Sequence, residues 1–383
     1  MSSRVAIRRC VDYQTERVCR VVAEAVAAVC DPHLLFAGKK VLIKPNLLAQ
    51  AGPDRAIDTH PEVIRALIRL CRQAGALEIT VGDQPGMQLT ENPEIAFTDS
   101  GIADVCAQEG ASFAPFSKNG FREIYSEKAL KLKYLLVAND LLDADVVINA
   151  PKLKSHIQSL YTGAIKNWFG TVSSRDRKRA HHLTKLEPFS ESLVDIFRIR
   201  PPELTVMDAV IGMEGAGPSE GKIKHLGLIF AGQDAVALDT VALACVDWAK
   251  MNVPMVRIAA EQGLGEADLS RIEIDGPPVA EVFKPFELPP RSFTNPPKFA
   301  AKIFYKFWYI RPRVAVENCT RCGACERMCP VNAITVREQS AVIDYNLCIQ
   351  CFCCHEACQF DAIGEDPSLA YRIHRWRERR KYQ

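Results

Sequence analysis

Two cysteine runs near the carboxyl end constrain this chain more than any other feature. The first, CTRCGACERMCP, spaces its cysteines as C-x2-C-x2-C-x3-C-P, and CIQCFCCHEAC repeats the same spacing. Nine of the fifteen cysteines lie between Cys319 and Cys358, whereas the other six are scattered singly. Regular doubled spacing of this kind is typical of a metal centre, and disulfides are rare in a reducing compartment.

The spacing is that of bacterial two-cluster ferredoxins, in which the fourth cysteine of each run ligates the cluster of the other run. A pair of zinc sites is the alternative, because zinc also uses C-x2-C pairs. Three cysteines at two-residue intervals with a distant fourth favour a cubane cluster. The pattern thus predicts two [4Fe-4S] clusters that exchange single electrons, with the ligand sets Cys319, Cys322, Cys325 and Cys358, and Cys348, Cys351, Cys354 and Cys329.

Two positions depart from the pattern. Gln359 stands where a proline usually follows the last cysteine, although Pro330 keeps that place in the first run. Cys353 is an extra thiol between Cys351 and Cys354. The spacing selects Cys354 as the ligand, so Cys353 is expected to pack beside the cluster or to tune it. An exchange of the two as ligands is the alternative.

Composition and charge bound the rest of the chain. Its 383 residues, 48% hydrophobic and 25% charged, are typical of a globular protein of one to three domains. The formal net charge of +2 argues against a protein that coats nucleic acid or an anionic membrane, so electrostatic recognition must be local. No apolar run reaches the ~18 residues of a transmembrane segment. The start, MSSRVAIRRC, lacks a signal-peptide core, and we expect a cytoplasmic protein.

The amino-terminal part alternates strand-like and helix-like segments. THPEVIRALIRLCRQAG is helix-like, with Pro61 in its first turn and Gly75 after its last. Five segments have the apolar, β-branched character of strands buried on both faces: KKVLIKPN, LEITVGD, ADVVINA, LTVMDAVIG and HLGLIFAG. This alternation predicts an α/β domain with a largely parallel sheet, followed by a small α+β domain of bacterial ferredoxin type.

Polar residues, glycines and prolines follow all five predicted strands. Ligands bind at the carboxyl ends of strands in open α/β sheets, so we expect these residues to share a crevice. NAPKLKSH sets Lys152, Lys154 and His156 at alternate positions after the third strand, which indicates that the crevice holds an anion. The other strand ends carry Lys44 and Asn46, Asp83, Asp208 and Glu214, and Gly232 to Asp234.

Two further segments bear on this crevice. GAIKNWFG sets Lys166 and Asn167 among apolar residues. Lys166 either extends along its aliphatic stem to water or is partly desolvated and directed at a ligand, and we favour the second. The charge run SSRDRKRAHH is interpreted as a solvated surface loop rather than a binding lid, and its His181-His182 pair as a weak indication of a metal site.

Six motifs occur in one order: KPNLL, THPEVIRALI, VGDQPG, NAPKLKSH, GAIKNWFG and MDAVIGMEGAGP. Together they resemble the DUF362 family, a domain of unknown function often fused to a ferredoxin module, over residues 1–290. The polar positions that the resemblance implies coincide with the strand-end residues, which supports one site without naming its reaction. They are Lys44, Asn46, Asp83, Lys152, Lys154, His156, Lys166, Asn167, Asp208 and Glu214.

These patterns divide the chain into four parts. We expect a DUF362-like α/β domain over residues 1–295, an aromatic and basic linker over 296–316, a two-cluster ferredoxin domain over 317–370 and a basic tail over 371–383. The linker is expected to dock the small domain, with a membrane-surface helix as the alternative. The tail is expected to be a solvated helix end, with attraction of an acidic electron donor as the alternative.

The leading hypothesis is an iron–sulfur oxidoreductase that passes single electrons between the clusters and an anionic substrate or cofactor. His156 is the expected proton donor, because imidazole titrates near neutral pH. The expected catalytic residues are His156, Lys152, Lys166 and Asp208. The expected substrate-binding residues are Lys44, Asn46, Asp83, Lys154, Asn167 and Glu214.

Partners and rival functions complete the expectations. We expect a redox partner protein and an anionic small molecule, with no nucleic acid and no transmembrane segment, and a homodimer remains open. A non-enzymatic electron-transfer or cluster-delivery adaptor is one alternative. A non-redox enzyme with structural or regulatory clusters is another.

Overall fold

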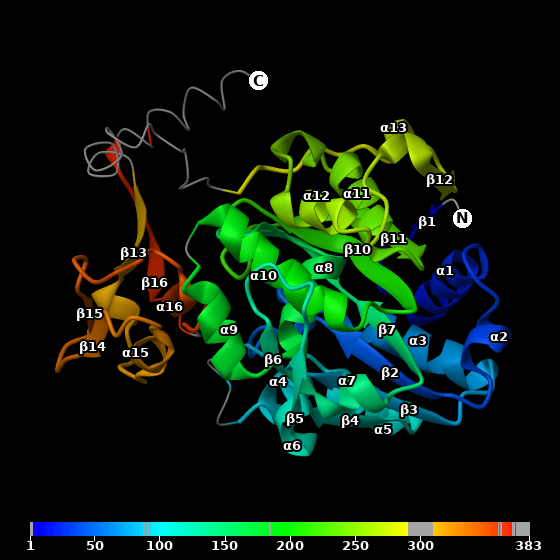
Figure 1. The fold of residues 1–383 in the computed structure, drawn as a ribbon, viewed down its shortest axis with the longest axis horizontal. Coiled ribbons are helices and arrows are strands. Elements are labelled where there is room, and N and C mark those ends of the chain that lie inside the picture. The colour runs from blue at the N-terminus through cyan, green and yellow to red at the C-terminus, as the bar shows by residue number, and fades with distance from the viewer. Residues whose placement is uncertain are drawn as a thin grey trace.

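The computed structural model describes residues 3–86, 89, 92–183, 185–289, 309–358, 360, 362–369 and 372. Figure 1 shows a large α/β domain, coloured blue to yellow, with a small orange and red domain beside it. Most of the expected linker, residues 296–308, and nearly all of the expected tail lie outside the described residues, as does Gln359. Within the described part of the chain, no helix is long and apolar enough to cross a membrane.

A ten-stranded sheet forms the centre of the large domain. Its strands are β1 Ser3–Arg9, β2 Lys40–Pro45, β3 Glu78–Asp83, β4 Ser112–Pro115, β7 Val146–Ala150, β8 Lys152–His156, β9 Leu160–Thr162, β10 Leu204–Glu214, β11 Lys222–Gly232 and β12 Ile272–Asp275. The main order is β12-β1-β11-β10-β7-β2-β3-β4, and β8 pairs with β10 and β9. The run from β4 through β3, β2 and β7 to β10 is parallel, which confirms the expected largely parallel α/β sheet.

Two features of the sheet differ from the expected crevice. β11 is antiparallel to β10, so its carboxyl end lies at the opposite edge of the sheet from the ends of β2, β3 and β7. Asp234 therefore does not join the crevice; its side chain instead accepts from the backbone N–H groups of Val236 and Ala237 at a helix start. The segment after β7 continues as the strand β8, in which the period of two keeps Lys152, Lys154 and His156 on one face.

Helices cover both faces of the sheet (Figure 1). Because strand side chains alternate, Val5 and Ile7 join one hydrophobic core and Ala6 joins the other. The helices are α1 Thr15–Ala27, α2 Pro32–Phe36, α3 Pro61–Gln73, α4 Glu94–Asp99, α5 Ile102–Glu109, α6 Phe116–Asn119, α7 Asn139–Asp143, α8 Ala164–Asn167, α9 Ser174–His181, α10 Leu186–Ile199, α11 Ala235–Cys245, α12 Pro254–Glu261 and α13 Val279–Val282. α1, α3 and α5 pack on one face, and α8, α10, α11 and α12 on the other.

The predicted helix after the first strand is α3. His60 caps its amino end by accepting from the N–H of Glu62, and Pro61 occupies the first turn. A separate antiparallel hairpin, β5 Phe121–Tyr125 and β6 Tyr134–Ala138, lies outside the main sheet.

The small domain has short elements around its cysteines. Its elements are β13 Ile310–Val314, α15 Ala324–Met328, β14 Ile334–Val336, β15 Ala341–Ile343, α16 Cys353–Glu356 and β16 Ile363–Pro367. β13 pairs with β16 and β14 pairs with β15, both antiparallel. Thus the end of the expected linker, residues 310–314, forms an edge strand of the small domain.

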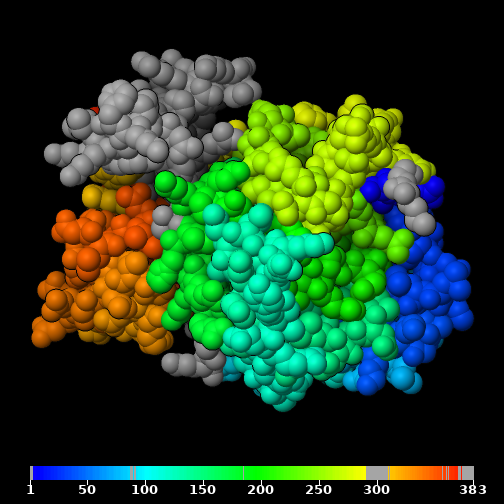
Figure 2. Space-filling model, viewed as in Figure 1, coloured from blue at the N-terminus to red at the C-terminus, as the bar shows by residue number. Residues whose placement is uncertain are grey.

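The small domain contacts the large domain through α9. Lys178 Nζ donates to the carbonyl of Arg327 at 3.3 Å, and the His182 ring lies 3.0 Å from the carbonyl oxygen of Pro330. Figure 2 shows the orange surface of the small domain abutting the green surface of the segment that contains α9. Since Arg327 and Pro330 flank Cys329, α9 lies close to one of the predicted cluster ligands.

Candidate functional site

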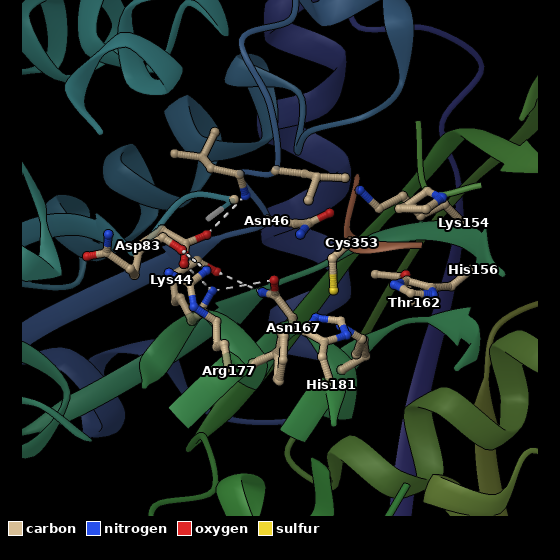
Figure 3. Close-up of a pocket in the computed structure, with 18 of the residues that line it drawn as sticks. Lys44, Asn46, Asp83, Lys154, His156, Thr162, Asn167, Arg177, His181 and Cys353 are labelled. Carbon is tan, nitrogen blue, oxygen red and sulfur yellow. Dashed lines mark hydrogen bonds and ion pairs between the residues drawn. The ribbon is translucent and has the colours of Figure 1, made fainter. Parts of the chain in front are cut away.

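A polar pocket lies between the ends of β2, β3 and β8, the helices α8 and α9, and the small domain. Figure 3 shows side chains from these elements converging on it. The pocket gives about 60 Å³ to the centres of water-sized molecules, which is room for several waters or a small anion. Seven of the ten polar positions proposed from the sequence line it: Lys44, Asn46, Asp83, Lys154, His156, Lys166 and Asn167. Lys152, Asp208 and Glu214 are not among its lining residues.

Lys44 and Asp83 form a fully buried ion pair in the pocket wall. Their Nζ and Oδ1 atoms are 2.7 Å apart, with side chains 0% and 2% exposed. Asp83 also accepts from the N–H of Leu47 at 2.9 Å. Burial lowers the pKa of Lys44 and raises that of Asp83, while the attraction between the two charges opposes both shifts.

Gly170 makes room for this pair. A Cβ atom at residue 170 would lie 2.2 Å from Asp83 Oδ1 and 2.9 Å from Lys44 Nζ. Steric exclusion therefore explains the glycine at the end of GAIKNWFG, because any side chain there would displace the ion pair.

Asn167 ties α8 to the end of β2. Its amide nitrogen donates to Asn149 Oδ1 at 2.8 Å and to the carbonyl of Pro45 at 3.2 Å, and its oxygen lies 3.4 Å from Lys44 Nζ. Asp239 holds the other end of α8 by accepting from the N–H groups of Ala164 and Ile165. These contacts fix the helix that carries Lys166.

Lys166 is buried beside aromatic rings. Its Nζ lies 4.0 Å from the ring centroid of Phe169 and 5.7 Å from that of Phe189. The residue is 7% exposed and lines the pocket, as expected for an ammonium group that is partly desolvated and not extended into bulk water.

β8 brings Lys154 and His156 to the pocket. Lys154 Nζ donates to the carbonyl of Ile57. The adjacent carboxyl group of Asp58 interacts with the Lys154 charge, yet burial raises the pKa of Asp58 to about 7. The charge carried by this corner of the pocket thus changes near neutral pH.

The ring of His156 is held in one tautomer. Its Nδ1 accepts from the backbone N–H groups of Gln158 and Ser159 at 3.1 and 3.2 Å. An imidazolium would need a proton on Nδ1, where these two N–H groups already point. Nδ1 is therefore an acceptor, which places the proton of the neutral ring on Nε2. The role of His156 as a proton donor stays a prediction.

The sequence interpretation of SSRDRKRAHH as a solvated loop was wrong. The segment forms α9, in which Asp176, Arg177 and His181 are 0%, 3% and 0% exposed. Arg177 donates to the carbonyls of Gln84 and Pro85, and Arg177 and His181 both line the pocket. A capping serine followed by an i, i+4 arginine–histidine pair was the available signal for a helix with a functional face.

Two buried oxygen atoms of pocket-lining residues lack a hydrogen-bond partner among the described residues. They are Thr162 Oγ1 and Asn46 Oδ1, and both residues line the pocket. Thr162 is 3% exposed. A buried polar atom without a partner costs free energy, so these atoms mark places where a bound molecule or water would be stabilised.

Lys152 and Asp208 form a second buried pair, outside the pocket lining. Lys152 Nζ lies 2.8 Å from Asp208 Oδ2 and also donates to Tyr13 Oη at 2.8 Å. Tyr13 donates to Asp208 Oδ1 at 2.7 Å and stacks on the His60 ring at a centroid distance of 3.5 Å. Burial lowers the pKa of Lys152 and lowers that of His60 to about 4. This closed cluster joins the segment before α1, the start of α3, and strands β8 and β10.

Glu214 also lies away from the pocket lining. Its carboxylate is 2.9 Å from Lys224 Nζ and accepts from the N–H of Glu287 at 2.7 Å. These contacts hold the end of β10 against the segment after α13, which is a structural position.

The cysteines of the small domain surround two further cavities. Cys319, Cys322, Cys325 and Cys358 line one of about 20 Å³, and Cys329, Cys348, Cys351, Cys353 and Cys354 line one of about 10 Å³. Backbone N–H groups of Ala333, Ala341 and Ala362 donate to the sulfur atoms of Cys329, Cys319 and Cys358, as thiolate ligands of iron–sulfur clusters accept. The described residues contain no group of three or more His, Cys, Asp or Glu suited to a single metal ion. The cysteines thus fit a cluster that occupies the space between them.

Comparisons with known proteins agree with this division. Residues 41–244 match the family model described as "Domain of unknown function (DUF362)", and residues 312–335 match a "4Fe-4S binding domain". A thylakoid-associated protein of Synechocystis sp. is 32% identical over 230 residues, which cover 60% of this chain and 68% of that protein. Ferredoxin Fdx2 of Sorangium cellulosum is 51% identical over 45 residues, 11% of this chain and 45% of that ferredoxin.

Among solved structures, the lactate racemase apoprotein of Thermoanaerobacterium thermosaccharolyticum has a TM-score of 0.41 at 14% identity. That match covers 60% of this chain and 54% of the racemase chain. The chain therefore spans less than two thirds of Fdx2 and of the racemase structure.

Proposed function

The chain belongs to the DUF362 family and carries a ferredoxin-type 4Fe-4S binding domain, and on this premise we propose that it is an iron–sulfur oxidoreductase acting on a small anion. The observation that carries the proposal is the pocket, where cationic side chains outnumber carboxylates and which the small domain helps to line. Among the lining residues that the structure describes, the cationic ones are Lys44, Lys154, Lys166 and Arg177, against the carboxylate of Asp83.

Charge supports an anionic ligand. The chain as a whole is nearly neutral at +2, so a pocket with an excess of positive side chains is a local feature and not a reflection of overall charge. The cations are buried, where attraction to an anion is weakly screened. Carboxylates and phosphates are the oxyanions that such groups bind best.

The roles proposed for the pocket residues follow from their contacts. Lys166 and Lys154 would bind the anion directly, because both are buried lysines that line the pocket. His156 would donate a hydrogen bond from Nε2 while its ring stays neutral. Thr162 would donate its hydroxyl, which has no partner in the described structure, to the anion, and the Asn46 amide oxygen would accept from a hydroxyl group or water bound beside it. Positive charge beside a developing oxyanion would be the main catalytic contribution.

The cofactor proposal is two [4Fe-4S] clusters, one in each cysteine-lined cavity. When bound, such clusters supply or accept single electrons. Each electron added to the bound molecule would be balanced by one electron lost from an external one-electron carrier protein, and the opposite direction reverses both changes. The redox partner, a cytoplasmic location and a homodimer remain predictions from the sequence.

The two rival functions make different demands. An adaptor that uses the large domain as a docking face would carry its polar strand-end residues on an exposed surface. Their burial favours a pocket instead. A non-redox enzyme would not need a pocket that shares lining residues with the cysteine loops, and Met328 and Cys353 from those loops line it.

Iron content and anion binding test the proposal. Anaerobically reconstituted protein should take up about eight iron atoms per chain, two cubanes' worth, whereas about four would contradict the two-cluster assignment. Calorimetric titration with acetate, and separately with phosphate, should detect binding of at least one of them. Lys166→Gln should weaken that binding about tenfold, roughly 1.4 kcal/mol.

The matched control is Lys118→Gln, which alters a lysine whose side chain is 64% exposed and lies outside the pocket. It should bind either anion as the unaltered chain does. Failure of both anions to bind, or equal weakening by both variants, would contradict an anion site at Lys166.

A further inference from the structure

The two cysteine runs adopt the same local backbone. Arg321 and Gln350, which follow the first cysteine at equivalent places, have φ values of 60° and 57°. Gly323 and Phe352 cap α15 and α16 with φ values of 75° and 59°. Ala324 is therefore the counterpart of Cys353. Because the first run holds its ligands with an alanine at this place, the ligand geometry does not require a thiol at residue 353.

The two cysteine-lined cavities have different surroundings. The cavity of Cys319 and Cys322 is bounded by Phe360, which is 45% exposed, and Cys322 itself is exposed. In the other cavity, Cys351 and Cys354 are 8% and 5% exposed. One cavity thus lies at the surface of the small domain, and the other lies toward the large domain.

Cys353 belongs to two cavities at once. It lines the cavity of Cys351 and Cys354, and it also lines the polar pocket of the large domain. Figure 3 shows its sulfur atom directed among Asn46, Asn167 and His181. Met328, which precedes the predicted ligand Cys329, lines the pocket as well. Of the cysteine-lined cavities in the described structure, only this one shares a lining residue with the pocket.

We propose that the set Cys329, Cys348, Cys351 and Cys354 is the substrate-side cluster site and that the Cys353 side chain contacts the bound anion, while the set with Cys322 faces the redox partner protein. This inference rests on the proposed anion pocket and adds which cluster site faces the anion and which faces the partner protein. The small domain then supplies part of the substrate site itself, and Cys353 is an anion-contacting residue between that site and one cluster.

The two runs provide matched variants for a test. Cys353→Ala gives the second run the alanine that the first run has at residue 324. Cys353→Leu places a larger side chain at the polar pocket. Ala324→Leu is the mirror control, because it places the same bulk beside the surface cavity. Iron content and the integrated electron paramagnetic resonance intensity of the reduced protein verify that both clusters have assembled in each variant.

Anion binding and cluster potentials are the measurements. Acetate or phosphate, whichever binds the unaltered chain, should shift the midpoint potential of one cluster to a more negative value, because added negative charge disfavours reduction, and should leave the other unchanged. Cys353→Leu should weaken binding at least tenfold and Cys353→Ala a few-fold, with Ala324→Leu unchanged.

The outcomes separate this inference from the function on which it rests. If neither anion binds the unaltered chain, the pocket proposal itself fails. If the anion binds and Lys166→Gln weakens it, but both Cys353 variants bind normally, the pocket stands and Cys353 does not contact the anion. Equal shifts of both potentials would overturn the assignment of one substrate-side cluster.

Discussion

Two buried lysine–aspartate pairs lie in the same sheet, one facing the pocket and the other enclosed by protein. Lys44 and Asp83 are 2.7 Å apart and line the pocket, and Lys152 and Asp208 are 2.8 Å apart and do not. Both lysines have pKa values lowered by burial. The pairs are equal in residue type and burial, and they differ in what surrounds them.

The surroundings explain the difference. Tyr13 forms hydrogen bonds with both members of the second pair, and the N–H of His60 donates to Asp208 at 3.0 Å, so two separate chain segments close over it. The first pair packs closely against Gly170, and both of its members line the pocket. A buried charge pair therefore indicates a binding site only when an adjacent surface is left open to a ligand, and otherwise it braces the fold.

The largest expected effect comes from removing either lysine. Lys44→Met and Lys152→Met each leave a buried carboxylate without its cation, which should lower the free energy of unfolding by about 3–5 kcal/mol. Denaturant titration measures this loss. Anion binding should then separate the pairs: Lys44→Met should lose it, and Lys152→Met, where it remains folded, should keep it.

An exposed pair supplies the reference for that comparison. Lys118 and Glu94 are 3.9 Å apart with side chains 64% and 56% exposed, so Lys118→Met should change stability by less than about 0.5 kcal/mol. If Lys152→Met lost anion binding at unchanged iron content, the Lys152–Asp208 pair would belong to the binding site. That result would contradict a purely structural role for the pair.

Much of this site was predictable from the sequence because strand periodicity and strand ends have fixed geometric consequences. Lys44, Asp83 and Lys154 meet because β2, β3 and β8 end at one edge of the sheet. The cysteine ligand sets remain predictions from spacing, and each set of four lines one of the two cavities of the small domain. Asp234 was misplaced because apolar patterning gives no strand direction, and β11 is antiparallel.

The sequence could not show which distant residue packs against each residue of the site. Tyr13 lies 139 positions from Lys152 along the chain, and no local pattern links them. Arg177 and His181 looked solvated because α9 is highly charged, yet both are buried. Arg177 donates to the segment after β3, and the His181 ring packs against Phe169 and Phe189. Long-range packing decides whether such residues are buried, and the periodicity of the sequence gives no information about long-range packing.

A smaller effect concerns pH on the pocket side. Burial raises the pKa of Asp58 to about 7, with Lys154 opposing the shift and Asp83 reinforcing it. Below this pKa the Asp58 carboxyl is neutral; above it, the carboxylate adds a negative charge that interacts with Lys154. Anion affinity should therefore fall roughly tenfold as pH rises through about 7, which calorimetry at several pH values measures.

Asp58→Asn is the control for this pH effect. Its side-chain oxygen can still accept from the N–H of Leu48, and it cannot ionise. The variant should bind the anion with an affinity that no longer changes between about pH 6 and 8, one pH unit either side of the Asp58 pKa of about 7. An unaltered pH profile in Asp58→Asn would assign the dependence to another group.

The smallest expected effect contrasts two buried threonines, one at each kind of site. Thr59 Oγ1 accepts from the N–H of Asn46 and donates to the carbonyl of Ala150, so Thr59→Val should destabilise the fold by about 1–3 kcal/mol. Thr162 Oγ1 has no partner among the described residues, so Thr162→Val should leave the free energy of unfolding unchanged or slightly higher. The cost of Thr162→Val should appear in binding, as a loss of about 1 kcal/mol, roughly fivefold in anion affinity.

Denaturant titration and calorimetry on both threonine variants measure the free energy of unfolding and the anion affinity. A Thr162→Val protein that is destabilised like Thr59→Val and binds normally would mean that its hydroxyl serves the fold, and the open side of the pocket would then not extend to β9.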